Sequence, residues 1–233
     1  WAGAGTFTYG TSTLVMTGTS KTICYTGNEA IGGLTISGTT TLKDIESGDS
    51  RLRVNGNLTV DASKTLASDD EEYLDVDDSG RTITMNNAAT GISSLYLIRF
   101  SHTSGTTNVP ACTTPRISCT GNGGTTTATG DLTITTELQI DSGATFNANG
   151  NTIAAKLVDL NSGTLNLSNS TLNFSVTSSG DSFHLYDGGT LITGNTTVNG
   201  NSSASPTTTW VPSAQGFEIV GDVSNLAIQA GGD

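Results

Sequence analysis

Residues 130–176 read GDLTITTELQIDSGATFNANGNTIAAKLVDLNSGTLNLSNSTLNFSV and contain the most regular pattern of the chain. Short runs in it alternate apolar with polar residues, as around Leu132 and Ile134 and again around Leu165 and Leu167. Such alternation places every second side chain on one face of a strand, and the Gly, Asn, Asp and Ser residues between the runs are typical of tight turns. The stretch therefore predicts short strands joined by turns.

Two phrases recur along the chain at intervals of twenty-odd residues. One is centred on Gly143, Gly163 and Gly189. The other has the form Gly-x-Leu-Thr-Ile/Val and begins at Gly32, Gly56 and Gly130, where the second interval is close to a multiple of the first. A sandwich also has short strands and turn signals, but a period of this size is the length of one solenoid coil rather than of one strand. We therefore expect an all-β, single-stranded β-solenoid (β-helix) with roughly 20–26 residues per coil.

The regularity of the pattern varies along the chain. Residues 1–100 are expected to form N-terminal coils, with an acidic insertion at 67–80. Residues 101–129 are irregular and rich in Gly, Thr and Pro, so they are predicted to form a loop that leaves the solenoid and returns. Residues 130–200 are predicted to be regular coils. Residues 201–233 are expected to begin with a loop and to continue as further coils of a truncated array.

Composition limits the classes of partner. The chain has 233 residues, of which only 13% are charged, and its formal net charge is −12. This acidic balance argues against nucleic acid as a partner, because phosphates require a basic surface. The sequence has no apolar run of about 18 residues, the length needed to span a bilayer, so membrane insertion is not expected.

The chain has one dense acidic run, from Asp69 to Asp78. Hard cations bind several carboxylate oxygens, so Asp75, Asp77 and Asp78 are candidate calcium ligands. The spacing and the closing Glu of an EF-hand are missing, and a solvated insertion is the favoured alternative. Calcium is the only cofactor that the sequence suggests.

Two of the three cysteines, Cys112 and Cys119, bracket six residues. A disulfide between them would close a loop, and we name this pair as the candidate disulfide. No CxxC motif or nearby His pair indicates zinc. Cys24 is expected to be a small buried side chain.

The sequence contains no GxSxG, no HExxH and no phosphate-binding glycine loop. An enzyme interpretation would combine Asp181, His184 and Asp187 as acid and base groups, in the way that paired carboxylates cleave glycosidic bonds. The favoured alternative is an outward strand without chemistry, because residues 163–178 contain no Asp or Glu to align with them. We therefore expect no catalytic residue and no enzyme.

Threonine-rich triplets suggest one further function. Regular Thr-x-Thr triplets on successive coils could bind ice. Triplets such as 133–135, 39–41 and 82–84 occur, but they do not follow one another once per coil. Ice binding is therefore disfavoured by the sequence.

Two stretches carry a resemblance to known proteins. Residues 7–19 (FTYGTSTLVMTGT) and 31–39 (IGGLTISGT) resemble repeats of very long extracellular β-solenoid proteins. Such repeats occur in phage tail and fibre proteins and in surface adhesins of bacteria and archaea. The resemblance covers most of the chain through degenerate motifs, and it carries over no catalytic residue.

The resemblance implies a non-enzymatic structural or adhesive segment of an exposed virion fibre or decoration, or of a cell-surface appendage. It implies an extracellular location at the virion or cell surface. The implied partners are other copies or a continuing chain of the same assembly, and host-surface glycans. The alternative is a carbohydrate-active β-helix enzyme, similar to a phage depolymerase, that acts on surface polysaccharide.

Overall fold

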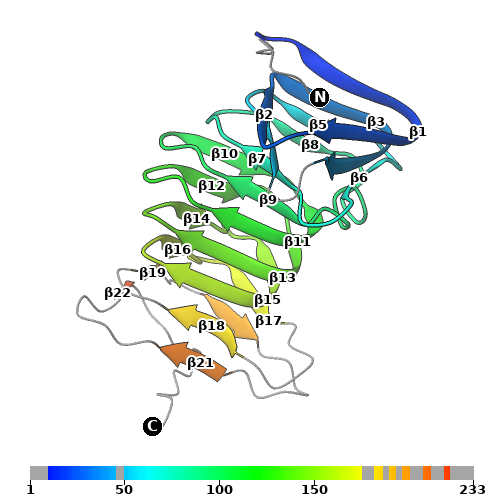
Figure 1. Ribbon diagram of the computed structural model, residues 1–233. Helices are drawn as coiled ribbons and strands as arrows, with labels where there is room; N and C mark the ends of the chain where they lie inside the picture. Colours follow the sequence, from blue (N-terminus) through cyan, green and yellow to red (C-terminus); the bar gives the residue numbers. More distant parts are fainter. Residues whose placement is uncertain are drawn as a thin grey trace.

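A computed structural model of the chain shows strands stacked into a β-solenoid (Figure 1). It describes residues 10–45, 50–174, 181–185, 189–192, 196–199, 207–210 and 218–220. Every regular element in these residues is a β-strand, and the strands stack in about eight turns of about 20 residues. Paired Cα positions lie one coil apart in sequence, as Thr13 with Gly33 and Thr39 with Thr65. The expected all-β solenoid is confirmed.

Two sheets follow one another along the axis. The first contains β1 (Thr13–Tyr25), β3 (Gly33–Asp44), β5 (Leu58–Val60), β6 (Thr65–Ser68) and β8 (Ile83–Met85). The second contains β10 (Thr106–Val109), β12 (Thr125–Ala128), β14 (Thr145–Asn147), β16 (Thr164–Asn166), β19 (Thr190–Ile192) and β22 (Glu218–Val220). A parallel bridge between Thr82 and Asn108 joins them, so the second sheet continues the wall that β5 and β8 begin.

A third sheet runs along most of the solenoid. It contains β2 (Asn28–Ile31), β4 (Arg51–Val54), β7 (Tyr73–Val76), β9 (Leu97–Phe100), β11 (Cys112–Cys119), β13 (Leu132–Asp141), β15 (Thr152–Asn161), β17 (Thr171–Phe174), β18 (Asp181–Leu185), β20 (Thr197–Asn199) and β21 (Thr207–Trp210). The longer strands contribute to two strips of this wall. The first half of β15 pairs with β17 and its second half pairs with β18.

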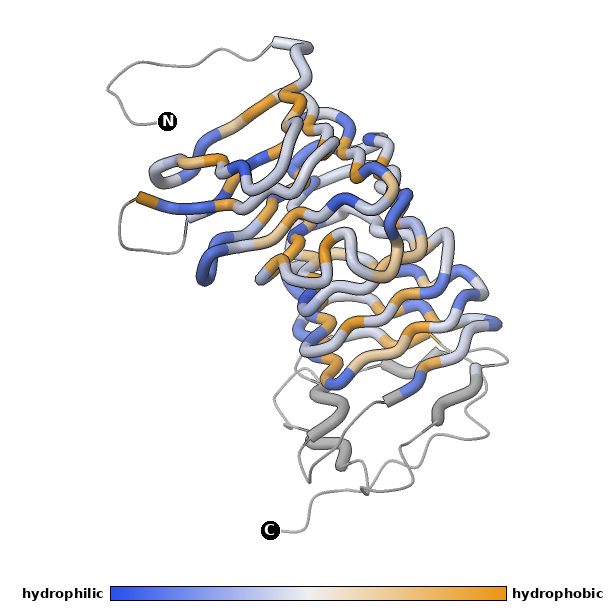
Figure 2. The backbone as a smooth tube through the Cα atoms, turned by 90° about the vertical axis from the view of Figure 1, so that its right-hand side faces the viewer, coloured by the Kyte–Doolittle hydropathy of each residue, from blue (hydrophilic) through white to orange (hydrophobic). Residues whose placement is uncertain are grey.

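The core is a column of stacked apolar side chains. Ile140 of β13 is paired with Leu160 of β15, and Phe146 of β14 with Leu165 of β16, and all four are fully buried. Polar and apolar residues alternate along these strands (Figure 2). Burying one such side chain contributes about 1.5–3 kcal/mol, and a single coil cannot bury its own apolar face. Stability therefore comes from stacking each coil on its neighbours.

Tight corners between strands require left-handed backbone at a few positions. Ser142 and Ser162 occupy the same corner of successive coils, with φ of 56° and 59°. Asn149 and Asn169 occupy another corner, with φ of 53° and 57°. Short polar residues tolerate this conformation because their side chains bond the nearby backbone.

The prediction that residues 101–129 form an irregular loop is wrong. They contain β10, β11 and β12, which continue the solenoid. The pattern is hidden because Thr107, Thr114 and Thr126 fill inward positions and are buried. Pro115, which cannot donate a ladder hydrogen bond, lies where the register of β11 shifts.

The acidic segment 67–80 is also not an insertion. It contains the end of β6 and all of β7, whose Leu74 and Val76 belong to the core. In the region 201–233 the structure describes two strands, β21 and β22. The first of these lies within residues 201–216, the part of this region that was predicted to be a loop. Among the described residues no helix is long and apolar enough to cross a membrane.

Candidate functional site

One face of the third sheet carries a row of polar side chains. We define the charged face as the outward residues of β4, β7 and β9 and of the second halves of β11, β13 and β15. Strand register aligns one residue from each coil in a single row: Arg53, Asp75, Arg99, Ser118, Gln139 and Asp159. Neighbouring coils are separated by about 4.8 Å, so each of these side chains lies beside the next.

Asp75 is the centre of this row. Its Oδ2 atom lies 2.7 Å from Nη2 of Arg99 and 3.2 Å from Nη1 of Arg51. Its Oδ1 atom accepts a hydrogen bond of 2.7 Å from the hydroxyl of Ser101. The carboxylate has no solvent exposure, although it points outward, because the arginines cover it. Burial raises the pKa of Asp75, against the Ser101 hydrogen bond and the Arg51 charge, which lower it.

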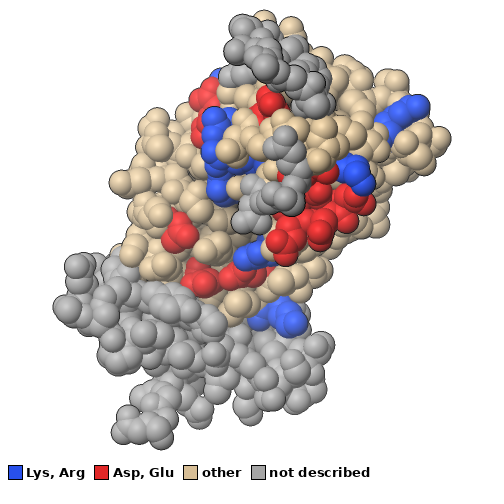
Figure 3. Space-filling model, in the orientation of Figure 1, with Lys and Arg blue, Asp and Glu red and all other residues tan. Residues whose placement is uncertain are grey.

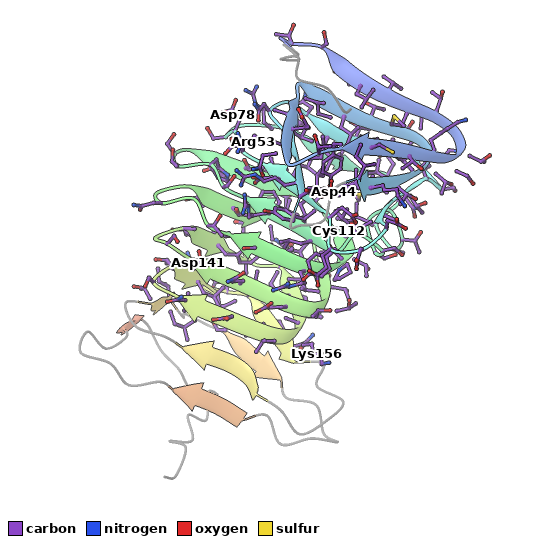
Figure 4. All side chains as sticks on the ribbon, in the orientation of Figure 1. Asp44, Arg53, Asp78, Cys112, Asp141 and Lys156 are labelled. Atoms are coloured by element: carbon purple, nitrogen blue, oxygen red, sulfur yellow. The ribbon has the colours of Figure 1, made fainter. Side chains whose placement is uncertain are left out.

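All five arginines of the chain form ion pairs with carboxylates. Four of the five pairs join successive coils: Arg51 and Arg99 with Asp75, Arg53 with Asp77, and Arg116 with Glu137. The fifth, Arg81 with Asp78, closes a turn. Basic and acidic side chains consequently lie next to one another on the surface (Figure 3), and Arg53 and Asp78 lie on the same side of the solenoid (Figure 4). Ion pairs between coils thus hold the charged face together, and we call the five arginine pairs the arginine clamps.

Two aromatic rings hold these guanidinium groups further. The guanidinium of Arg99 lies 5.0 Å from the ring centre of Tyr73, and that of Arg116 lies 5.5 Å from the ring centre of Tyr96. Nη1 of Arg116 also donates a hydrogen bond of 3.1 Å to the Tyr96 hydroxyl. Such stacking stabilises a cation, so Arg99 and Arg116 are each held by a carboxylate and by an aromatic ring.

The far end of the charged face carries two aspartates on adjacent coils. Nε2 of Gln139 donates to Oδ2 of Asp141 at 3.2 Å, and Asp141 lies at the end of β13 (Figure 4). Asp159 follows on the next coil, in register with Gln139. Burial raises the pKa of Asp141, opposed by a hydrogen bond from Ser142. Carboxylates of two adjacent coils therefore lie on the same face.

The structure places the three predicted calcium ligands within the arginine clamps. Asp75 and Asp77 share the hydroxyl of Ser101, but each also has an arginine partner, as does Asp78. In the described part of the chain, no group of three or more His, Cys, Asp and Glu side chains gathers into a metal site. Calcium binding stays a prediction, and it would require the arginines to be displaced.

The predicted disulfide is wrong. Cys112 and Cys119 are free thiols at opposite ends of β11, and each is paired with a different residue of β13. Extended backbone advances about 3.3 Å per residue, whereas a disulfide needs Cα atoms within about 7 Å. The segment that was expected to be a loop is a strand, and a strand holds its ends apart. Cys24 is partly buried, so the expectation that it is a fully buried side chain is not met.

The candidate acid and base residues fall where the structure describes no side chains. Asp181 and His184 lie in β18, whose backbone register places His184 beside Asp159. Asp187 lies outside the described residues. The backbone thus extends the row of the charged face by one position, to His184.

Five strands of the second sheet have an outward face without charged side chains. We define the threonine face as the outward residues of β10, β12, β14, β16 and β19. One row consists of threonine on five successive coils: Thr106, Thr125, Thr145, Thr164 and Thr190. The adjacent row is Asn108, Thr127, Asn147, Asn166 and Ile192. A single threonine therefore recurs once per coil on this face. Among these strands a full Thr-x-Thr triplet occurs only in β12, so the expectation that such triplets do not recur once per coil holds for this face.

Comparison with family models, with curated proteins and with solved structures finds no match to this chain.

Proposed function

We propose that the chain is a non-enzymatic structural or adhesive segment of an exposed assembly. The assembly would be a virion fibre or decoration, or a cell-surface appendage, and its location would be extracellular. One observation carries the proposal: every arginine of the chain is paired with a carboxylate, and four of the five pairs tie one coil to the next.

Ion pairs of this kind support a structural role rather than a catalytic one. A catalytic site needs polar groups that converge on a space for substrate and that are held ready for the transition state. On the charged face, Arg51, Asp75 and Arg99 instead satisfy one another and exclude solvent from the carboxylate. The result is resistance to separation of the coils, which a shaft under load requires.

The ends of the sheets support the proposed partners. Within the described residues, β1 and β2 are each the last strand of a sheet. The edge of a terminal strand presents unpaired N–H and C=O groups, which can pair with another strand. We propose that other copies or a continuing chain of the same assembly stack there, and that host-surface glycans contact the sides of the rod.

Incubation with surface polysaccharides tests this function. The purified chain should release no new reducing ends, and any glycan that it retains should be recovered intact. Release of reducing ends at a rate proportional to protein concentration would overturn the proposal.

A second candidate function is a carbohydrate-active enzyme of the depolymerase kind. It is favoured by Asp141 and Asp159, which place carboxylates on adjacent coils. If this function were correct, Asp141→Asn and Asp159→Asn would each abolish reducing-end release. The matched variant Asp69→Asn, at a half-exposed carboxylate beside Lys43, would not.

A further inference from the structure

The threonine face has a regular two-dimensional geometry. Its rows run along the solenoid axis with a repeat of about 4.8 Å, and the two residues of each strand are separated by about 6.6 Å. The threonine row covers five coils without interruption. Four inter-coil steps make it about 19 Å long.

The hydroxyl groups of this row are available to an external partner. In the described part of the chain, no hydrogen bond to protein engages the side-chain hydroxyl of any of the five threonines. Threonine is β-branched and has few rotamers, so its hydroxyl and methyl groups have few orientations. The row thus presents hydroxyls and methyls at a fixed repeat.

Two asparagines of the adjacent row are held by hydrogen bonds from the turns that follow them. Oδ1 of Asn147 accepts a hydrogen bond of 3.0 Å from the backbone N–H of Asn149, and Oδ1 of Asn166 accepts one of 3.0 Å from the N–H of Ser168. These bonds hold each amide group in one orientation. Asn147 and Asn166 are therefore preorganised, which lowers the entropy lost on binding at these two positions.

The chemistry of the face narrows the class of partner. None of its ten outward residues is charged or aromatic. Ionic polymers require opposite charges, and soluble sugars are commonly held by aromatic rings and charged hydrogen-bonding groups. An uncharged lattice with oxygen atoms at a similar repeat requires neither, and ice has such a lattice.

We infer that the threonine face binds the surface of ice through its in-register rows of threonine and asparagine. The hydroxyl and amide groups hold water in an ordered layer that joins the crystal, and the methyl groups lie against it. This inference does not depend on the proposed structural function, because it rests on another face of the solenoid.

Ice recrystallisation and thermal hysteresis test the inference directly. The wild-type chain should limit crystal growth at concentrations at which albumin does not. The double variant Thr125→Lys/Thr145→Lys places two charges in the row and should need an at least about tenfold higher concentration, the factor for about 1.4 kcal/mol of lost binding. The matched control Thr133→Lys, on the same coil but on an exposed position of another sheet, should keep wild-type activity.

Two outcomes would overturn the inference. In the first, the wild-type chain has an intact β-sheet circular dichroism spectrum, yet ice crystals grow as fast in its presence as in the presence of albumin. In the second, Thr133→Lys loses as much activity as the row variant. The conservative variant Thr145→Val keeps the side-chain shape without the hydroxyl, and full activity in it would assign binding to the methyl groups and contradict the role given to the hydroxyls.

Discussion

Asp75 of β7 and Arg99 of β9 lie one coil apart, with 2.7 Å between Oδ2 and Nη2, and the carboxylate of Asp75 has no exposure to solvent. Arg51 reaches the same oxygen from the coil on the other side. One buried carboxylate therefore ties three successive coils together. In a solenoid, where each coil contacts only its neighbours, such a tie opposes separation at two interfaces at once.

Removal of this carboxylate should destabilise the protein strongly. In Asp75→Ala, Arg51 and Arg99 lose their shared partner, and breaking a buried pair in this way costs about 3 kcal/mol or more. Urea unfolding monitored by circular dichroism measures the change. The matched variant Asp69→Ala breaks the half-exposed pair with Lys43 and should stay close to wild type, because surface pairs contribute little. Equal losses of unfolding free energy in the two variants would show that the Asp75 ion pairs contribute no more to stability than a surface pair does.

Calcium should have little effect on stability. The carboxylates of Asp75, Asp77 and Asp78 already have arginine partners, so a cation would have to displace them. We expect the melting temperature to be the same in millimolar calcium and in excess chelator. A rise with calcium that Asp77→Asn abolishes would instead establish the predicted calcium site.

The two buried thiols should be unreactive in the folded protein. Burial raises the pKa of Cys112 and of Cys119 to about 12, so almost no thiolate forms at neutral pH. A thiol reagent at pH 8 should modify Cys24 alone in the native chain and all three cysteines in urea. Reducing agent should leave the melting temperature unchanged. A native mass lower by two hydrogens would contradict the free thiols of Cys112 and Cys119.

Asp141 should make stability depend on pH. Burial raises its pKa above the ordinary value of 3.8, so the folded state binds this proton more tightly than the unfolded chain. Its contribution is complete below pH 3.8 and is lost as the pH rises through the folded pKa. The melting temperature of wild type minus that of Asp141→Asn should therefore be larger near pH 4 than at pH 7. A larger difference at pH 7 would show that the folded pKa is lowered.

The repeated phrases correctly predicted where strands form and that they stack, but they did not predict the sheet to which each strand belongs. Leu34 and Leu58 share the Gly-x-Leu-Thr phrase and are partners in the first sheet, as a common phrase suggests. Leu132 has the same phrase, yet it pairs with Cys112 and Ile153 in the third sheet. A local phrase specifies a strand and its inward side chains, whereas the wall to which the strand belongs depends on coil lengths elsewhere in the chain.

The sequence contains a pattern that indicates the charged face, although it was not used to predict that face. Arg51 and Asp75, and likewise Asp75 and Arg99, are separated by one coil in the sequence. A search for opposite charges one period apart would have found the clamps. The threonine row was harder to find because its steps are unequal, and the step from Thr164 to Thr190 is longer than the step from Thr145 to Thr164. Insertions at the corners change the spacing and leave the stacking intact.

Immunogold electron microscopy of the source culture, with antibody against this chain, would show where the protein lies on particles and cells. A clamped rod that serves as a structural or adhesive segment should carry label along virion fibres or decorations, or along the appendages of cells. Label absent from every particle and envelope, with the antigen dissolved in the medium, would contradict a structural role and would favour the secreted enzyme.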